Sequence, residues 1–284
     1  KIASVTGVGQ FSGGVACPGS NAGSVGMSML TQLGMGLTVG GNILVGQYCG
    51  SCDQESRRKA SGNLLTLGVL FGLLFTALVA LLGRPLLMLL RSPTLDEATA
   101  YLTICGAGLL FIFAYNAMSA TLRGVGNSRI PLYCIIVSVS LNVVLDILFV
   151  AVFRWGVAGA ALATVLGQAV SCLTALVFCL CHRTDLGLLP RWLRPEGSMV
   201  KRILKLGFPT ALQWTIASIS WLVVLALVNQ HDVPISAANG VSNTIRDFCQ
   251  LFISALPTGC GTICAHCLWA RPFDRASHVL CRCL

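Results

Sequence analysis

Residues 130–153 have the sequence IPLYCIIVSVSLNVVLDILFVAVF, a long apolar run with one charged residue, Asp146. A helix needs about 20 apolar residues to cross the hydrocarbon core of a bilayer, so this run predicts a transmembrane helix. Ser138, Asn142 and Asp146 are spaced i, i+4, i+8 and therefore share one face of that helix. An Asp near the centre of a membrane helix costs about 2.5–3.5 kcal/mol on insertion scales. Such a residue is expected where function requires it, and Asp146 is therefore the first candidate site.

The composition of the whole chain is typical of a membrane protein. Of its 284 residues 55% are hydrophobic and 10% are charged, and the mean hydropathy is +0.79. Soluble domains carry roughly 25% charged residues, so this chain cannot cover a water-exposed surface. The net charge of +9 does not indicate nucleic-acid binding, because the basic residues lie in connectors between apolar runs and are not interleaved with aromatic residues. The predicted fold class is an all-α integral membrane protein.

Seven segments reach membrane length. They cover residues 22–48, 63–83, 98–121, 131–153, 156–181, 200–228 and 235–268. The connector 182–199 is the longest and most polar, and we take it as the boundary between two domains, residues 1–190 and 191–284. The segments 22–48 and 235–268 resemble each other weakly, which indicates a six-helix repeat in one orientation. Parallel repeats of this kind are typical of transporters.

Connectors rich in Lys and Arg alternate along the chain with connectors that are poor in them. One set of connectors holds Arg57, Arg58, Lys59, Arg123, Arg129, Arg183, Arg191, Arg194, Lys201, Arg202, Lys205, Arg271, Arg275 and Arg282. The other set holds only Lys1, Arg84, Arg91 and Arg154. The excess of Lys and Arg places the first set in the cytoplasm, so we expect a multi-pass protein of the cytoplasmic (inner) membrane. The segment 22–48 then runs from outside to inside, which predicts that a first helix is mostly missing upstream.

The fourteen cysteines are expected to pack rather than to form a disulfide framework or a metal centre. Most of them lie in apolar runs, where Cys behaves as a small apolar side chain. Cys49-x-x-Cys52 and Cys264-x-x-Cys267, with His266, offer metal ligands but lack the usual zinc spacing. The sequence contains no phosphate-binding loop and no His/Cys/Ser arrangement typical of catalysis. We therefore expect neither an enzyme nor a resident cofactor.

Four stretches carry a family signature when they are taken in order. They are residues 45–50 (VGQYCG), 122–131 (LRGVGNSRIP), 141–146 (LNVVLD) and 156–164 (GVAGAALAT). In combination and spacing they resemble the MATE (multidrug and toxic compound extrusion) transporters, over nearly the whole chain. The resemblance implies twelve helices in two six-helix lobes around a central cavity, and export by alternating access. The seven predicted segments would then be helices two to eight of the family, so we expect an incomplete transporter.

The resemblance also implies a cation-coupling site in the first lobe. An Asn and an Asp one turn apart on the family's fifth helix match Asn142 and Asp146, and a Thr and a Tyr of the same network match Thr164 and Tyr101. Such a site would take up H⁺, or would bind Na⁺ at Asp146 and Asn142. The family's other acidic residue, an Asp on its first helix, would align near Ser4, where this chain has no acidic residue. Through divergence or truncation, the site in this chain is therefore expected to be incomplete.

Other polar residues of the membrane segments are candidates for the wall of a substrate cavity. A polar stripe on a membrane helix is expected to face a cavity or another helix rather than lipid. The candidates are Gln168, Gln213, Asn239, Asn243, Arg246 and Asp247. For these residues, as for Asn142 and Thr164, a structural hydrogen bond between helices is the alternative. Tyr101 is equally explained as an aromatic anchor at the membrane interface.

The predicted function is antiport of organic cations or drugs against H⁺ or Na⁺ by a monomer in the lipid bilayer. A flippase for lipid-linked oligosaccharides, from the same superfamily, is one alternative. Its cavity should be strongly basic to hold pyrophosphate, whereas the membrane segments contain a single Arg, Arg246, apart from Arg202 at the connector end of 200–228. A seven-helix receptor is the second alternative, which the six-helix repeat and the charge distribution disfavour. Nucleic acid is not expected as a partner.

Overall fold

The computed structural model describes residues 17–89, 95–181 and 193–228, and the positions 242, 246, 249, 259–262 and 264. In these parts of the chain the regular structure is helical throughout. The elements are α2 (Cys17–Gly50), α3 (Gln54–Leu89), α4 (Leu95–Gly124), α5 (Arg129–Asp146), η1 (Ile147–Val152), α6 (Gly156–Cys181) and α8 (Gly197–Val228). The first six predicted segments are thereby confirmed as helices. The seventh, 235–268, lies mostly outside the described residues, although its described positions are helical.

Several helices extend beyond the apolar runs that predict them. Helix α3 begins at Gln54 rather than at residue 63, because Asp53 caps it: the backbone N–H of Ser56 donates to Asp53 Oδ1 at 3.0 Å. An ion pair between Lys59 and Glu55 (3.0 Å) supports the same polar first turns. Apolar length therefore predicts where a helix crosses the membrane, while caps and charged pairs decide where it begins.

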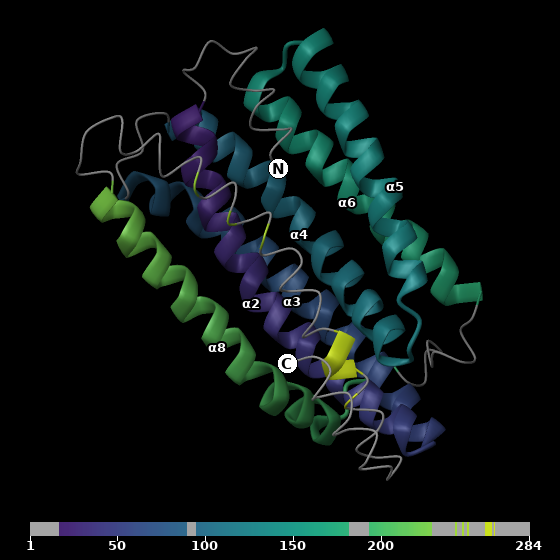
Figure 1. Ribbon diagram of the computed structural model, residues 1–284. Helices are drawn as coiled ribbons and strands as arrows, with labels where there is room; N and C mark the ends of the chain where they lie inside the picture. The colour runs from purple at the N-terminus through teal and green to yellow at the C-terminus, as the bar shows by residue number, and fades with distance from the viewer. Residues whose placement is uncertain are drawn as a thin grey trace.

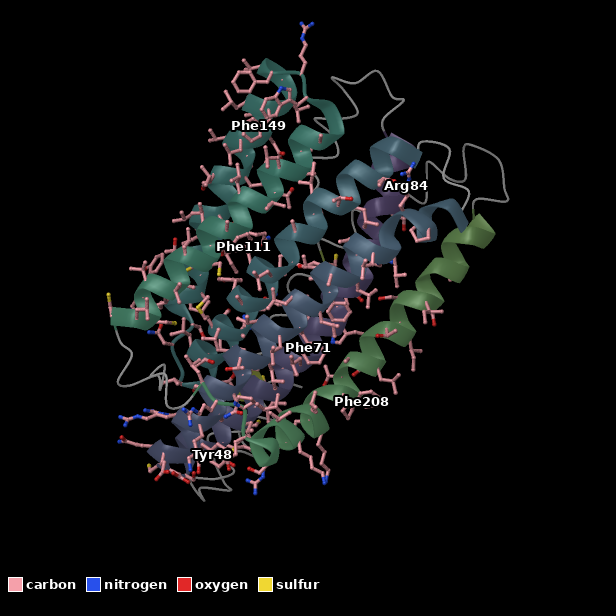
Figure 2. The ribbon with its side chains drawn as sticks, turned by 180° about the vertical axis from the view of Figure 1, so that it is seen from behind. Tyr48, Phe71, Arg84, Phe111, Phe149 and Phe208 are labelled. Atoms are coloured by element: carbon pink, nitrogen blue, oxygen red, sulfur yellow. The ribbon has the colours of Figure 1, made fainter. Side chains whose placement is uncertain are left out.

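The helices form a slab with α2, α3 and α4 in the middle. Helix α8 lies along α2 at one edge, and the pair α5–α6 lies at the opposite edge, with α6 packed against α4 (Figure 1). Seen from behind, α8 and the α5–α6 pair again lie at opposite edges (Figure 2). Consequently one face of α2 is directed toward α8, while α5 is covered mainly by α6.

Helices α2 and α8 approach so closely that their backbones touch. We call this contact the α2–α8 seam; it contains Gly36 and Gly40 of α2 and Gly207 and Ala211 of α8. A Cβ atom on Gly40 would lie 2.5 Å from the backbone nitrogen of Gly207 and 2.6 Å from the carbonyl oxygen of Ile203. Only glycine fits at position 40 without displacement of a helix.

Apolar side chains cover the outer surface of the slab. Among the described residues, four helical stretches are long and apolar enough to cross a membrane: Gln54–Pro85, Leu102–Gly124, Arg129–Val152 and Ala158–Cys181. The exposed large apolar side chains on α3 and α5 fit a lipid environment, in which an apolar exterior carries no penalty. The structure thus agrees with the predicted all-α membrane fold.

The two ends of the slab differ in charge. Nitrogen atoms of basic side chains gather around the end at which Tyr48 lies, whereas Arg84 and Phe149 lie at the other end (Figure 2). We call the Tyr48 end the basic end. Two hydrogen bonds at this end tie the connector before α8 to α3: Thr66 Oγ1 donates to the carbonyl of Leu193 (2.7 Å), and the N–H of Glu196 donates to Asn63 Oδ1 (2.7 Å). The division into domains 1–190 and 191–284 stays a prediction, and α8 begins at Gly197, within the predicted connector.

Candidate functional site

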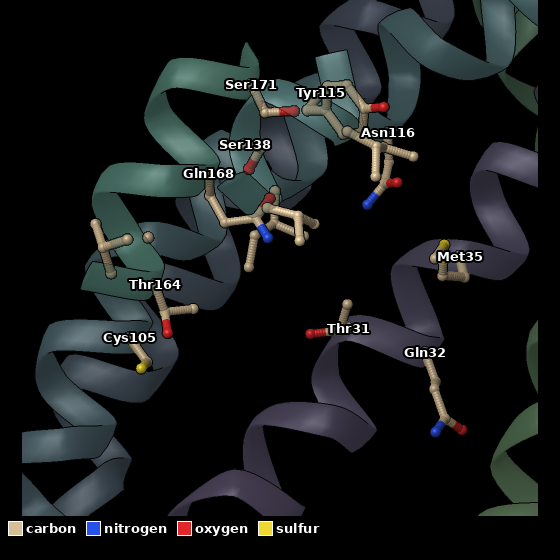
Figure 3. A pocket seen from close by; sticks show the side chains of 15 residues that line it. Thr31, Gln32, Met35, Cys105, Tyr115, Asn116, Ser138, Thr164, Gln168 and Ser171 are labelled. Atoms are coloured by element: carbon tan, nitrogen blue, oxygen red, sulfur yellow. The ribbon is translucent and has the colours of Figure 1, made fainter. Parts of the chain in front are cut away.

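A cavity of about 460 Å³ lies between α2, α4, α5 and α6. Its size falls within the range of about 300–1,000 Å³ that is usual for small-molecule sites. Hydrogen-bonding side chains reach it from all four helices: Thr31, Gln32, Tyr115, Asn116, Ser138, Thr164, Gln168 and Ser171. Thr31 and Met35 of α2 lie across the space from Ser138, Thr164 and Gln168 (Figure 3).

The lining of this cavity is neutral. The residues that line it include no Asp, Glu, Lys or Arg among those that the structure describes, and the rest of the wall is formed by apolar side chains such as Ile112, Ile135 and Val165. Amides and hydroxyls provide donors and acceptors without a fixed charge. The arrangement is suited to a largely apolar molecule that is oriented by a few hydrogen bonds.

A hydrogen bond between α5 and α6 holds the polar wall in place. The hydroxyl of Ser138 donates to the backbone carbonyl of Gly167 at 2.7 Å, and Ser138 is buried. A Cβ atom on Gly167 would lie 3.3 Å from Cβ of Asn142, so the missing side chain lets α5 approach α6 at this level. The first two residues of the predicted polar face, Ser138 and Asn142, thus face α6 rather than lipid.

Asp146 ends α5 at the point where the helix changes its winding. Asp146 is 8% exposed, and the next six residues form the π-helical segment η1. The N–H of Phe153 accordingly donates to the carbonyl of Leu148, five residues back, at 2.9 Å. Single π-helical turns occur frequently at functional sites. With a rise of 1.5 Å per residue, Asp146 lies about 12 Å along the axis from Ser138, beyond the cavity lining.

Two further predicted residues line the cavity directly. Thr164 and Gln168 project from successive turns of α6 into it (Figure 3). The hydroxyl of Thr164 donates to the carbonyl of Ala160 in its own helix at 2.9 Å, which leaves its oxygen lone pairs as potential acceptors. Placement in the wall supports Gln168 as a cavity residue, and the coupling roles of Thr164, Asn142 and Asp146 stay predictions.

The remaining candidates lie elsewhere or outside the described residues. Gln213 is exposed on α8, and Arg246 is exposed as well; neither lines the cavity between α2 and α6. The side chain of Tyr101 lies outside the described residues, although its backbone belongs to α4. Asn239, Asn243 and Asp247 also lie outside the described residues.

Sequence reasoning missed Tyr115 and Asn116 of α4. The Tyr115 hydroxyl is buried and donates to the carbonyl of Pro131 at 3.1 Å, which connects α4 to the first turn of α5. Asn116 lies in the apolar run 98–121 and lines the cavity. An amide inside an apolar run is the signal that also marked Asn142, and it would have identified Asn116.

Several cysteines pack as predicted, whereas Cys260, also in a predicted apolar segment, is disulfide-bonded. Cys134, Cys172 and Cys179 are buried in one apolar cluster that joins α4, α5 and α6, and Cys105 is buried in the neighbouring cluster. In the two Cys-x-x-Cys pairs, for which no metal centre is expected, Cys52 is exposed, and Cys267 lies outside the described residues.

Two curated relatives of the chain are named as multidrug resistance proteins. The chain is 27% identical over 261 residues to "Probable multidrug resistance protein YoeA" of Bacillus subtilis, covering 89% of this chain and 56% of the relative. It is 39% identical over 152 residues to "Probable multidrug resistance protein YpnP" of the same organism, covering 53% of this chain and 34% of the relative. The chain thus spans about half the length, or less, of these curated relatives.

The fold is shared with a solved structure described as "Outward-facing conformation of a multidrug resistance MATE family transporter of the MOP superfamily". The two superpose with a TM-score of 0.85 at 20% identity, over 99% of this chain and 63% of the other. The model of the MatE family matches residues 2–148. Because this match covers more than half of the chain, the chain belongs to the MatE family, and the resemblance to MATE transporters drawn from its sequence is confirmed.

Proposed function

We propose that this chain forms the first lobe, and the beginning of the second, of a cation-coupled multidrug exporter in the cytoplasmic membrane. The observation that carries the proposal is the burial of Asp146 inside a membrane-spanning segment, 8% exposed, at the junction of α5 and η1. An acidic residue inside a membrane span is costly, and such residues mark ion pathways. The relatives named as multidrug resistance proteins support an export role.

Asp146 is the residue to which we assign the coupling ion. A carboxylate removed from water is stabilised by a bound cation, and it releases that cation when water regains access. Asn142 lies one turn away on the same face and offers an amide oxygen, a suitable ligand for Na⁺ or a partner for a protonated carboxyl. Ser138 continues this face into the cavity wall. The polar face therefore connects the ion site to the cavity over about 12 Å.

The cavity between α2 and α6 is the proposed substrate-binding part of this lobe. Its neutral polar groups and apolar walls suit organic molecules of drug size, and Gln168, Thr164 and Asn116 are positioned to form hydrogen bonds with them. Gln213, Asn239, Asn243, Arg246 and Asp247 remain proposed for the opposite wall. No reacting group or resident cofactor is required, since transport moves molecules without breaking a covalent bond.

The flippase alternative finds little support in this cavity. Pyrophosphate of a lipid-linked sugar requires several cationic side chains, whereas the described lining contains none. The receptor alternative is disfavoured by the membership of the chain in a family of transporters.

The test measures export of a fluorescent organic cation, such as ethidium, by the full-length protein in proteoliposomes. A proton gradient and a Na⁺ gradient are imposed separately, and the wild type is compared with Asp146→Asn. We expect export with one of the gradients, and its loss in Asp146→Asn. Asp53→Asn, which removes a carboxylate from an exposed helix cap, is the matched control and should export normally. Undiminished coupled export by a well-folded Asp146→Asn variant would remove Asp146 from the mechanism.

A further inference from the structure

A second cavity opens at the basic end, between α2 and α8. It has a volume of about 320 Å³ and is lined by Leu44, Gln47 and Tyr48 of α2 and by Arg202, Lys205 and Leu206 of α8. It shares no lining residue with the cavity between α2 and α6. The transport scheme above makes no use of it.

The polar part of this second cavity is built for an anion. Arg202 and Lys205 are one turn apart on α8 and supply two positive charges, and Gln47 adds an amide from α2. No acidic side chain lines the cavity, and in the part of the chain that the structure describes neither Arg202 nor Lys205 forms an ion pair. Two cations without a counter-ion attract a phosphate group, for which guanidinium and ammonium groups are the usual protein ligands.

The guanidinium of Arg202 is held in position before any ligand binds. One of its terminal nitrogens, Nη1, donates to the hydroxyl of Tyr48 at 2.7 Å, and Tyr48 is itself buried. The remaining N–H groups of the guanidinium are available to an anion, because arginine has five donors. This bond also spans from α8 to α2, so an anion at Arg202 would be held between the two helices.

The other wall of the cavity is apolar. Leu44 precedes Tyr48 by one turn, and Leu206 follows Arg202 by one turn, so both leucines lie on the membrane side of the basic groups. Phe208 and Leu212, farther along α8, are exposed apolar residues that would lie in lipid. A charged rim above an apolar wall matches a phospholipid, whose phosphate lies at the interface and whose acyl chains extend into the bilayer. Basic pockets between membrane helices on the cytoplasmic side bind anionic headgroups in this way.

We propose that the cavity formed by Gln47, Tyr48, Arg202 and Lys205 binds the phosphate of an anionic phospholipid. A net negative headgroup such as phosphatidylglycerol suits two adjacent cations, whereas the choline of phosphatidylcholine brings a positive charge of its own. Because the cavity is shared by α2 and α8, the bound lipid stabilises the contact between these helices. Leu44 and Leu206 favour a lipid over a soluble phosphate ester.

The experiment compares lipid retention by the full-length protein, purified from mixed micelles that contain equal amounts of phosphatidylglycerol and phosphatidylcholine. Native mass spectrometry gives the ratio of the two lipids bound. The wild type is expected to retain several-fold more phosphatidylglycerol, and Arg202→Gln/Lys205→Gln should retain the two lipids equally. The matched control, Arg194→Gln/Lys201→Gln, removes two exposed charges near the same end of α8 that do not line the cavity, and should keep the wild-type preference.

A second arm separates a lipid from a soluble anion. Glycerophosphoglycerol, which has the headgroup without acyl chains, is added in large excess and is expected to leave the bound lipid in place. Displacement of the lipid by this compound would assign the cavity to soluble phosphate esters and overturn the lipid proposal. An unchanged lipid preference in Arg202→Gln/Lys205→Gln would overturn it as well. Lys205→Gln alone leaves the bond between Arg202 and Tyr48 intact, so its expected partial loss of preference does not depend on that contact.

Discussion

Substitution of Gly40 by Ala tests whether α2 and α8 touch through their backbones. The added Cβ atom would lie 2.5 Å from the nitrogen and 2.7 Å from Cα of Gly207, whereas ordinary van der Waals contacts begin near 3.4 Å. The helices must therefore separate locally by about 0.9 Å. The atoms in the way belong to the backbone of α8, so no side-chain rotation can relieve the clash.

The expected cost follows from two opposing effects. Overpacking of a tight contact destabilises a protein by about 1–3 kcal/mol. Replacement of Gly by Ala inside a helix contributes up to about 1 kcal/mol in the opposite direction. We expect Gly40→Ala to lower the free energy of unfolding by about 1–2 kcal/mol, and a bulky Gly40→Leu to lower it further.

Unfolding of the purified full-length protein by sodium dodecyl sulfate, followed by circular dichroism, measures this difference. Gly197→Ala is the control, because a Cβ atom there meets no atom within 4 Å at the start of α8, and it should be neutral or slightly stabilising. If Gly40→Ala unfolded at the same detergent fraction as Gly197→Ala, the reasoning about the α2–α8 seam would be refuted.

Three further predictions concern single hydrogen bonds. Ser138→Ala removes the buried bond to α6 and should cost about 0.5–1.5 kcal/mol in the same unfolding assay, whereas the exposed Ser140→Ala should cost nothing measurable. Asn63→Ala removes a buried side chain that joins α3 to the connector before α8, and a loss of about 1–3 kcal/mol is expected; an unchanged midpoint would show that the connector is not held there. Asp53→Ala removes the cap of α3 and should cost about 1 kcal/mol at pH 7. The hydrogen bond from Ser56 lowers the pKa of the Asp53 carboxyl below its ordinary 3.8. The stability that the cap contributes is therefore present above pH 3.8 and is lost as the pH falls through the lowered pKa. A difference in unfolding free energy between Asp53→Ala and wild type that persisted undiminished at about pH 2 would contradict this assignment.

The transmembrane helices follow from local properties of the chain. A run such as 130–153 has too many apolar residues for any exposed soluble structure, and in lipid its backbone must satisfy its hydrogen bonds within a helix. The same local property singles out Asp146, since one charge in such a run is conspicuous in any fold. Helix ends do not follow from apolar length in the same way, because the residues that extend α3 to Gln54 are polar and carry no membrane signal.

The amino-acid sequence by itself determined which segments are helical, which face of α5 is polar, and to which family the chain belongs. Only the tertiary structure decided which polar faces meet. Thr31 and Ser138 are separated by more than a hundred residues, yet they line one cavity because α2 and α5 pack on opposite sides of it. Arg202 and Tyr48 likewise form a basic cavity only because the glycines of the α2–α8 seam allow two distant helices to touch. Helical periodicity is a property of neighbouring residues, whereas a cavity depends on how whole helices pack, and no local pattern of residues specifies that packing.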